Sequence, residues 1–568
     1  PKRYKELNLS KLGTYFAMAR GYQEDGKQVK ALPMKKWFNT NYHYIVPELE
    51  EDAVLSINDD KPFKLYKEAK DLGIDTKPVI TGPFTMIKLV NNKSNKDWIS
   101  EFINVYKEIL EKFSQSGISY LQVDEPILVT DLTKEDIKLF NKIYKELLRD
   151  KLSYKVILQT YFGDVRDVYE DIIKLDFAGY GFDFLEGYRN IELIKKHGFP
   201  KEKLLFAGLV NGKNIWKNNY NKTIKAFNEL KEYVDEENLV LSTSCSLLHV
   251  PYTVKNETNL KSEFKETLAF AEEKLDELEE LKVLVNDKDY ANNKAYLANQ
   301  KALNDKLVNP LCFNKEVRDK VNSLKAEDFH RKEEFDVRRK IQKDELKLPV
   351  LPTTTIGSFP QTSEVKKLRK SFRTGEITKE QYEESIKEKI QEVIKFQEDI
   401  GLDVLVHGEY ERNDMVEYFG KLLDGFIFTS NGWVQSYGTR GVKPPIIFGD
   451  VKRSKDLSVS WITYAQSLTK KYVKGMLTGP ITILNWSFPR EDLDLKNITY
   501  QIGLAIGEEV LELEKAGIKI IQIDEAALRE KLPLRKADWY KDYLDWAIPA
   551  FRLTNSKVKA DTSIHTHM

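Results

Sequence analysis

Short apolar runs alternate with amphipathic stretches through the first half of the chain. The runs are rich in Val, Ile, Leu and aromatic residues, and Gly, Pro, Asp or Ser follows each of them. Helical patterns such as 98–116 and 134–148 lie between the runs. This alternation predicts parallel strands covered by helices. The predicted strands are 77–85, 118–126, 154–162, 177–185, 203–212 and 238–247.

The pattern changes between residues 261 and 352. Apolar residues first recur at intervals of three and four, which predicts an amphipathic helix. Charged helical sequence then continues to about Leu346, and Pro349 and Pro352 end it. We therefore expect a solvated helical connector. The recurring apolar residues are Phe264, Leu268, Ala271, Leu275, Leu278 and Leu281.

The second half repeats the alternation and also two short motifs of the first half. A Thr-Gly-Pro motif and an Asp-Glu pair occur in the same order in each half. Gly82 precedes Asp124 by 42 positions, and Gly479 precedes Asp524 by 45. Two matches in one order indicate a duplication. The apolar runs of this half are 353–360, 403–409, 445–451, 473–480, 519–525 and 561–568.

Repeated βα alternation with polar strand ends predicts the α/β class and two (βα)8 barrels. A doubly wound nucleotide-binding sheet is disfavoured, because the sequence has no G-x-G-x-x-G and no Walker-type loop. The expected domains are an N-terminal barrel at 1–260, a helical linker at 261–352 and a C-terminal catalytic barrel at 353–568. A barrel takes about 250 residues, so we expect the second barrel to be incomplete and the first to lack its start.

Composition narrows the class of partner. Lys plus Arg and Asp plus Glu both number 89, so the balance gives no reason to expect nucleic acid or an anionic membrane as partner. The sequence has no apolar run long enough to span a bilayer. Only two cysteines, Cys245 and Cys312, favour buried thiols in a reducing, cytoplasmic compartment.

Several strand ends of the second half carry polar groups that would face one another on a closed barrel. Carboxylates beside backbone N–H groups suit the ammonium and carboxylate of an amino acid. A lone Asp-Glu pair after a strand could equally cap the next helix. The groups are Ile356-Gly357-Ser358, His407-Gly408-Glu409, Asp524-Glu525 and the pair His565 and His567.

Two other features suit additional ligands. His565 and His567 lie two apart, so on a strand they share one face, as metal ligands do. Trp486 offers a stacking surface for a flat heterocycle, and Lys36 lies in a cationic, aromatic stretch suited to a polyanionic tail. The alternatives are a His pair without metal, a core tryptophan and a surface lysine.

Long motifs in this sequence resemble those of one enzyme family, the cobalamin-independent methionine synthases. The resemblance runs from about residue 30 to the end. The motifs are Lys36-Trp37-Phe38-Asn39-Thr40-Asn41-Tyr42-His43-Tyr44, Ser244-Cys245-Ser246-Leu247-Leu248-His249, Thr353-Thr354-Thr355-Ile356-Gly357-Ser358-Phe359-Pro360-Gln361, His407-Gly408-Glu409 with Glu411-Arg412-Asn413-Asp414-Met415-Val416-Glu417-Tyr418-Phe419, Asn431-Gly432-Trp433-Val434-Gln435-Ser436-Tyr437-Gly438 and Ile564-His565-Thr566-His567-Met568.

The resemblance implies two face-to-face (βα)8 barrels, the first without catalytic function of its own. It implies methyl transfer from 5-methyltetrahydropteroyltri-L-glutamate to L-homocysteine as the last step of methionine biosynthesis, with zinc and without cobalamin. N5 of the folate must be protonated to leave, and zinc holds the attacking thiol deprotonated. We also expect a monomer with small-molecule substrates, no nucleic acid and no membrane.

The resemblance also assigns roles to residues. For homocysteine it implies Ile356, Gly357, Ser358, Glu409 and Asp524, with Glu525 structural. For the folate it implies Lys36, Arg440, Gly441, Trp486 and Glu530. His567 matches the zinc histidine of the family, whereas His565 does not.

The sequence departs from the family pattern at both ends. The other zinc ligands and the histidine that protonates the folate are expected beyond Met568, and a folate-contacting Phe-Pro-Arg stretch before Pro1. Ala526 also stands where the family has proline, whereas the first half keeps Pro126. We therefore expect a piece of the enzyme with no catalytic residue of its own, inactive and weak in metal binding. The alternatives are a non-catalytic binding homologue and a related zinc thiol methyltransferase with another methyl donor.

Overall fold

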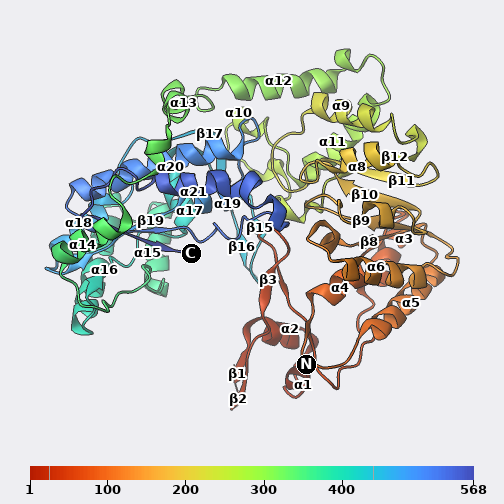
Figure 1. Ribbon diagram of the computed structural model, residues 1–568, viewed down its shortest axis with the longest axis horizontal. Coiled ribbons are helices and arrows are strands. Elements are labelled where there is room, and N and C mark those ends of the chain that lie inside the picture. The colour runs from red at the N-terminus through yellow and green to blue at the C-terminus, as the bar shows by residue number, and fades with distance from the viewer. Residues whose placement is uncertain (25, 439) are drawn as a thin grey trace. The chain divides into compact units, whose positions relative to one another are not determined.

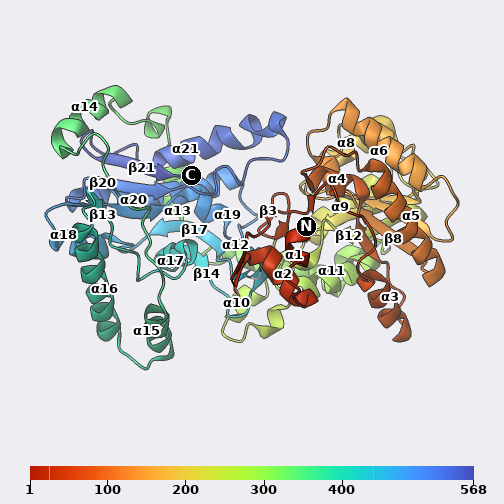
Figure 2. The same ribbon diagram turned by 90° about the horizontal axis from the view of Figure 1, so that it is seen from below.

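The computed structural model describes residues 1–24, 26–438 and 440–568, which fold into two compact units (Figures 1 and 2). Unit 1 comprises Pro1–Asn304, Asn431–Lys443 and Leu534–Ala537. Unit 2 comprises Asp305–Ser430, Pro444–Pro533 and Asp538–Met568. Within the described residues, no helix combines the length and apolarity that crossing a membrane requires.

Unit 1 is built on a six-stranded sheet in the order β12-β11-β10-β9-β8-β6, in which every neighbouring pair is parallel. The strands lie side by side in Figure 1. Each of the six strands predicted in the first half occurs. Their bounds are β6 (Val79–Thr81), β8 (Tyr120–Asp124), β9 (Lys155–Gln159), β10 (Gly179–Asp183), β11 (Leu204–Val210) and β12 (Leu239–Thr243).

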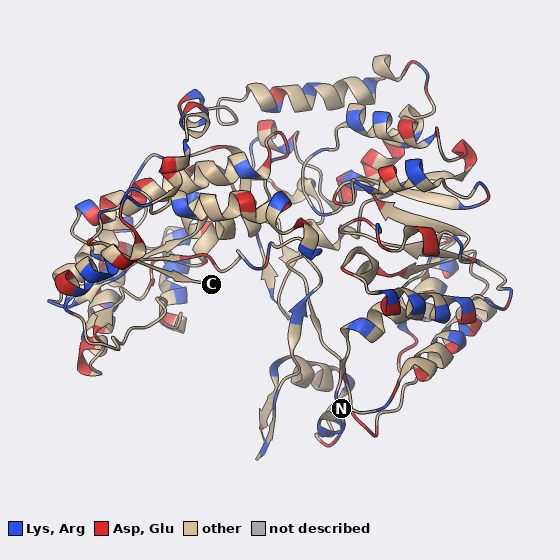
Figure 3. Cartoon of the chain, viewed as in Figure 1, with Lys and Arg blue, Asp and Glu red and all other residues tan. Residues whose placement is uncertain are grey.

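Helices cover this sheet, which explains its apolar strands. All five residues of β10 are buried, as expected for a strand covered on both faces. Both signs of charge are spread along the helices (Figure 3). The helices are α3 (Lys61–Asp71), α4 (Pro83–Leu89), α5 (Ile99–Ser116), α6 (Lys134–Leu147), α7 (Tyr169–Ile172), α8 (Asn190–His197), α9 (Tyr220–Leu230), α10 (Ser262–Lys265) and α11 (Ala271–Leu284).

Smaller elements complete unit 1. Its first residues form helices and short strand pairs, and segment 431–443 adds the antiparallel hairpin β15–β16. These elements are α1 (Lys2–Lys5), α2 (Lys11–Arg20), β1 (Tyr22–Glu24), β2 (Lys27–Val29), β3 (Met34–Lys36), β4 (His43–Ile45), β5 (Glu48–Leu49), β7 (Asn91–Asn92), β15 (Val434–Gln435) and β16 (Gly441–Val442).

The predicted amphipathic helix starts later than its pattern suggests. Leu268 forms an antiparallel bridge with Trp216, and the amide of Ala269 donates to the carbonyl of Ile215 at 2.7 Å. Helix α11 therefore begins only at Ala271, because tertiary pairing holds the preceding residues extended. The charged helical stretch does continue to Leu346, as predicted, through α12 (Lys294–Val308), α13 (Lys315–Asn322) and α14 (Phe335–Leu346).

Three parallel strands of unit 2 form one sheet, β19 (Gly475–Thr478), β20 (Ile520–Asp524) and β21 (Ser563–His567), and β13 (Val404–Leu405) pairs with β18 (Tyr472–Val473). This unit also contains β14 (Leu423–Ile427) and β17 (Ile446–Arg453). Two expectations are corrected here. The run 353–360 forms a single bridge, between Ser358 and Gly408, instead of a strand. The reason is that the Thr353 carbonyl accepts from the amides of both Asp403 and Val404, which does not continue as a regular ladder. The run 445–451 does form a strand, but β17 pairs antiparallel with the unforeseen β14.

The strands of unit 2 are β13 (Val404–Leu405), β14 (Leu423–Ile427), β17 (Ile446–Arg453), β18 (Tyr472–Val473), β19 (Gly475–Thr478), β20 (Ile520–Asp524) and β21 (Ser563–His567). The helices are α15 (Ser363–Thr374), α16 (Lys379–Asp399), α17 (Met415–Leu422), α18 (Val459–Ser467), α19 (Pro480–Asn485), α20 (Leu495–Lys515) and α21 (Asp545–Leu553). The α/β class with parallel strands is confirmed, whereas closure into two eight-stranded barrels stays a prediction.

The two units repeat one local arrangement around the Thr-Gly-Pro motif. In unit 2 the buried carboxylate of Glu525 accepts from the amides of Ile481 and Thr482, at 3.2 and 2.7 Å, and from the Thr482 hydroxyl at 2.8 Å. In unit 1 Glu125 accepts the corresponding bonds from Phe84 and Thr85. Each glutamate thus satisfies the first amides of the helix that follows the neighbouring strand.

This arrangement explains the motif residue by residue. A Cβ on Gly479 would lie 2.4 Å from Glu525 Oε2, and one on Gly82 2.2 Å from Glu125 Oε1. Only glycine leaves room for the carboxylate at that position. The following proline occupies the first turn of α19 or α4, where its missing N–H costs nothing. The glutamate of each Asp-Glu pair is therefore structural, as predicted for Glu525.

Replacing the Thr482 hydroxyl tests this capping contact. Thr482→Val keeps the shape but removes a donor to buried Glu525 and the acceptor of the Ala527 amide. We expect the free energy of unfolding to fall by about 1–3 kcal/mol, measured by urea denaturation. Thr482→Ser, which keeps the hydroxyl, should recover most of this loss. Equal losses in both variants would contradict the role of the hydroxyl.

Candidate active site

Strand β20 places Asp524 at the end of its parallel sheet. Its register pairs Asp524 with Thr478 of β19 on one side and with His567 of β21 on the other. Unit 1 has the same register, with Asp124 paired to Thr81 and Gln159. Asp524 is partly exposed, whereas Glu525 is fully buried. Of the two acids, Asp524 is the one that a ligand can reach.

The glycine turn predicted from the sequence lies against Glu409. Ser358 bridges Gly408 in parallel fashion, and the amide of Phe359 donates to the Gly408 carbonyl at 3.0 Å. A Cβ on Gly357 would approach Glu409 Oε1 to 2.6 Å. Glycine is required there, both for this contact and for its φ of +148°. The structure thus brings the turn and the carboxylate together.

Glu409 itself has a left-handed backbone conformation. Its φ is +59°, and Gly408 before it has a φ of +88°. A non-glycine residue in this region is uncommon and is retained where the surroundings fix it. Here the conformation presents the Glu409 side chain to the turn at Gly357.

A buried charge cluster supports Glu409 from behind. Nε of Arg412 donates to Glu411 Oε1 at 2.8 Å, its Nη2 donates to the Met476 carbonyl at 2.9 Å, and its Nη1 lies 3.6 Å from Glu409 Oε2. His407 Nε2 lies 3.1 Å from the same Glu411 oxygen. Burial by itself would lower the pKa of Arg412, but the charges of Glu409 and Glu411 raise this pKa above its usual value. Its guanidinium is therefore a permanent cation beside Glu409.

The charge of Glu409 acts on the carboxyl group of Asp524. Burial raises the pKa of the Asp524 carboxyl and the charge of Glu409 raises it further, while Gln522, His567 and Arg412 oppose the rise. Two nearby carboxylates repel when both are ionised, so a cation placed between them is favoured. The ammonium group of an amino acid meets that requirement.

The predicted folate residues of unit 2 contact each other directly. Trp486 Nε1 donates to Glu530 Oε2 at 3.1 Å. Trp486 lies at the C-terminal end of α19 and is only partly buried, although it packs against the apolar core of unit 2. Its indole ring therefore has a fixed orientation and an accessible part.

The other predicted folate residues belong to unit 1. Lys36 ends β3 and lines a pocket of about 480 Å³ together with Lys35 and Lys88. Arg440 is exposed in the hairpin, its amide donating to the Tyr437 carbonyl at 3.0 Å, and Gly441 begins β16. Because these residues and Trp486 lie in different units, their gathering into one folate site stays a prediction.

His567 is the exposed last residue of β21, and His565 lies two residues before it on the same strand. Among the residues that the structure describes, no group of three or more His, Cys, Asp or Glu side chains could hold a metal ion. Zinc sites need at least three protein ligands. These residues therefore do not form a zinc site by themselves. Cys245 and Cys312 are buried thiols, as predicted.

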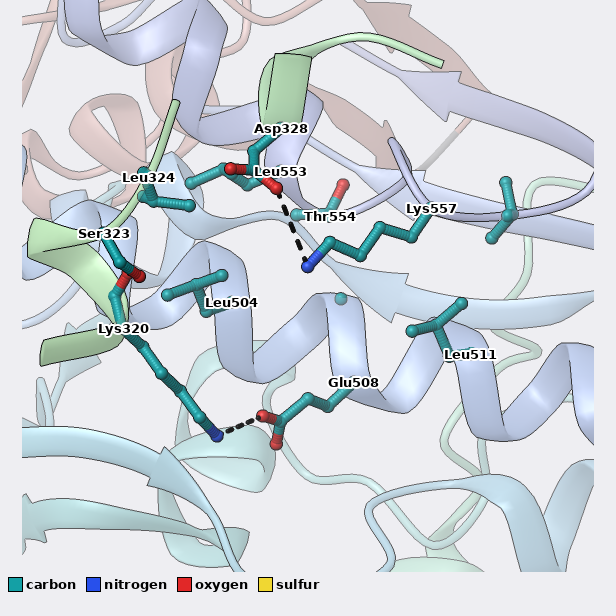
Figure 4. A pocket seen from close by; sticks show the side chains of 12 residues that line it. Lys320, Ser323, Leu324, Asp328, Leu504, Glu508, Leu511, Leu553, Thr554 and Lys557 are labelled. Atoms are coloured by element: carbon teal, nitrogen blue, oxygen red, sulfur yellow. Dashed lines mark hydrogen bonds and ion pairs between the residues drawn. The ribbon is translucent and has the colours of Figure 1, made fainter. Parts of the chain in front are cut away.

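A pocket of about 330 Å³ in unit 2 is lined by none of the predicted site residues (Figure 4). It lies between α13, α20 and α21. Its charged side chains are paired, Lys320 with Glu508 at 3.2 Å and Lys557 with Asp328 at 3.8 Å. Because these four side chains already form ion pairs with one another, none of them is directed at a ligand.

At the corresponding strand end of unit 1, side chains of the same unit donate hydrogen bonds to Asp124. The Tyr161 hydroxyl donates to Asp124, and Tyr161 is buried. Burial raises the pKa of Asp124 to about 6. Gln159 stands at the register position that His567 occupies in unit 2. An amide is a poor metal ligand, so this end lacks the features of the second.

Sequence reasoning missed the groups that surround Asp524 and Glu409. They are Glu411, Arg412, Lys474 and Gln522, all of them buried. One signal was available, because both halves read Gln-x-Asp-Glu and both have a lysine four residues before Thr-Gly-Pro. Glu411 and Arg412 lacked any such internal repeat.

Comparison with known proteins agrees with the motifs. The family model "Cobalamin-independent synthase, N-terminal domain" matches residues 1–235, and "Cobalamin-independent synthase, Catalytic domain" matches residues 351–568. Proteins named 5-methyltetrahydropteroyltriglutamate–homocysteine methyltransferase are 56% identical in Lactococcus lactis and 55% in Campylobacter jejuni. Each match covers 100% of this chain and 74% of the relative.

Among solved structures, a B12-independent methionine synthase from Shewanella matches 38% of this chain and 62% of its own. The identity is 23% and the TM-score is 0.33, a score too low to support an inference about shared geometry.

The charge cluster behind Glu409 predicts a pH-dependent stability. Burial alone would raise the pKa of Glu411, but His407 and Arg412 lower it to about 2. A carboxyl whose pKa is lowered on folding stabilises the protein above its unfolded value of about 4.5, and this is lost as the pH falls through about 2. Glu411→Gln should therefore reduce the free energy of unfolding by about 3 kcal/mol at pH 7.

Urea denaturation of both proteins between pH 7 and pH 2.5 measures this effect. The difference between parent and Glu411→Gln should shrink steadily below about pH 4.5. A difference that stays constant over the whole range would show that the Glu411 charge contributes nothing.

Proposed function

The chain belongs to the family of cobalamin-independent methionine synthases, and we propose that the protein transfers a methyl group from 5-methyltetrahydropteroyltri-L-glutamate to L-homocysteine. The products are L-methionine and the demethylated folate, and the reaction is the last step of methionine biosynthesis. The observation that carries the proposal is the convergence of Glu409, Asp524 and the Gly357 turn on one place in unit 2.

Each of these groups has a role in holding homocysteine. Glu409 and Asp524 accept hydrogen bonds from the substrate ammonium, which relieves the repulsion between the two carboxylates. The turn at Ile356, Gly357 and Ser358 brings backbone to the carboxylate end of the same amino acid. Held at both ends, homocysteine keeps its side chain in one direction, so that its sulfur meets the methyl group in line.

The transfer is a displacement at carbon. The homocysteine thiolate supplies the electron pair of the new S–CH₃ bond, and the N5–CH₃ bond of the folate breaks. Its electron pair returns to N5, which must be protonated for the amine to leave. Trp486 offers a flat face to the pterin, and its bond to Glu530 fixes the ring orientation.

The outer part of the folate site is proposed in unit 1. Lys36, with Lys35 and Lys88 at the same pocket, provides cations for the carboxylates of the glutamate tail. Arg440 and Gly441 of the hairpin complete the set that the family resemblance implies. The corresponding strand end of unit 1, where Tyr161 donates to Asp124, takes no part in the proposed chemistry.

We propose zinc as the metal of the whole protein, with His567 as a ligand. When bound, zinc would keep the homocysteine thiol deprotonated near neutral pH. The proposal rests on the family motif at 564–568, because the described residues lack a group of three ligands.

We propose a domain organisation of two (βα)8 barrels, at 1–260 and 353–568. A helical linker at 261–352 joins them. We also propose a monomer that works in the cytoplasm.

The direct test is homocysteine-dependent demethylation of 5-methyltetrahydropteroyltri-L-glutamate by the full-length protein, with no cobalamin present. Methionine should form in equal amount to the demethylated folate. Methyl transfer from a different donor alone would identify a related thiol methyltransferase, and homocysteine binding without turnover would identify a non-catalytic homologue.

Asp524→Asn tests the ammonium contact. The variant keeps the shape and the Gln522 contact region but removes the charge. We expect KM for homocysteine to rise roughly tenfold to a hundredfold, because a hydrogen bond to a charged group is worth about 1.5–3 kcal/mol. Asp124→Asn, at the same register position of unit 1, is the matched control and should leave KM unchanged. Similar effects of the two variants would argue against the assigned role of Asp524.

His567→Ala tests the metal ligand. Competition with a chromophoric chelator should show zinc affinity of the full-length protein reduced by at least roughly a hundredfold, since even groups behind the ligands contribute 10–100-fold. His565→Ala, two residues earlier on β21, should retain its zinc. Loss of zinc from His565→Ala alone would reverse the assignment.

A further inference from the structure

A buried lysine lies behind the proposed homocysteine site. Lys474 stands between β18 and β19, and only 1% of its surface is exposed. Its Nζ donates to Gln522 Oε1 at 2.7 Å and to the Thr355 carbonyl at 2.9 Å. A buried cation is costly unless it is hydrogen-bonded and has a countercharge nearby. Burial lowers the pKa of Lys474, and the charges of Asp524 and Glu409 oppose that shift.

Gln522 connects this lysine to two parts of the site. Its Nε2 donates to the Ile356 carbonyl at 2.8 Å and to Asp524 Oδ1 at 2.7 Å. A lysine only donates hydrogen bonds, so the amide oxygen of Gln522 must face Lys474. Its two N–H groups must then face Ile356 and Asp524. The lysine therefore decides which way the amide points.

We propose that Lys474 and Gln522 are positioning residues that fix the Asp524 carboxylate and the Ile356 turn in one arrangement for the amino-acid end of homocysteine. This inference rests on the proposed function. Gln522 holds Oδ1 of Asp524, which sets the direction of Oδ2. The same amide holds the carbonyl of Ile356, so the ammonium and carboxylate contacts of the substrate keep a constant separation.

Unit 1 contains the same residue types without the proposed substrate contact. Lys77 stands four residues before its Thr-Gly-Pro motif, as Lys474 does. Gln122 Nε2 donates to Asp124 Oδ1 at 2.8 Å, but Tyr161 also donates to Asp124 and Lys77 Nζ lies 4.4 Å from the centre of the Phe206 ring. Substitution of Gln122 therefore removes the corresponding contact to Asp124 in a place where we propose no substrate contact.

The experiment compares Gln522→Met with Gln122→Met in the full-length protein. We expect Gln522→Met to raise KM for homocysteine about tenfold or more, because Asp524 loses its fixed orientation. KM for the methyl-folate should stay within about twofold. Gln122→Met should leave both constants unchanged. Dissociation constants of homocysteine from isothermal titration should follow the KM values.

Gln522→Glu separates positioning from packing. Glutamate has nearly the same size and still accepts from Lys474, but it cannot donate to Asp524 when ionised. Its KM for homocysteine should rise at least as much as that of Gln522→Met. A role in packing alone predicts a small change. Lys474→Met and Lys77→Met extend the comparison to the cation, and urea denaturation identifies any variant that is only unfolded.

Equal KM values in Gln522→Met, Gln522→Glu and the parent would overturn the positioning role. A parent protein that binds homocysteine without transferring a methyl group would contradict the proposed function only, since the dissociation constants still test positioning. A parent protein that does not bind homocysteine would overturn both.

Discussion

In each unit, a buried glutamate carboxylate links one strand of the parallel sheet to a helix. That helix is the one that follows the neighbouring strand. Glu525 accepts hydrogen bonds from the first amides of α19, and Glu125 does the same for α4. These amides have no partner within their own helix. Hydroxyl groups add further bonds to each buried glutamate, from Thr482 in unit 2 and from Thr85 and Tyr144 in unit 1. Strand β20 is therefore held in place relative to α19. Because Asp524 precedes Glu525 directly, its position is held as well.

The fixed position of Asp524 also determines which charged side chains surround it. The Glu409 carboxylate lies close enough to raise the pKa of Asp524, and two buried cations, Arg412 and Lys474, lie near this pair. Arg412 supports Glu409 directly, whereas Lys474 acts on Asp524 through Gln522. The cations reduce the cost of keeping two carboxylates at one place. Their hydrogen bonds also limit the directions in which the carboxylates can point.

The two units share the contacts of the capping glutamate but differ at the strand ends. Unit 1 retains the capping glutamate, the glycine that makes room for it and the Gln122–Asp124 contact. It differs where a ligand would be held, since Tyr161 donates to Asp124 and Gln159 takes the register position of His567. The capping contacts that both units share hold the strands and helices together. In unit 2, Gln522 also donates to the Ile356 carbonyl and accepts from Lys474.

The sequence by itself determined the α/β class, the six strands of unit 1, the repeated motif and the residues that end the strands. Hydrophobic periodicity and turn residues are local, so they can be read without tertiary structure. Only the tertiary structure decided that α11 starts at Ala271, that β17 pairs antiparallel with β14, and that Glu525 caps a helix while Asp524 is partly exposed. It alone showed Arg412, Lys474 and Gln522 beside the carboxylates. Those outcomes depend on pairing and burial between residues far apart in the chain, which no local pattern encodes.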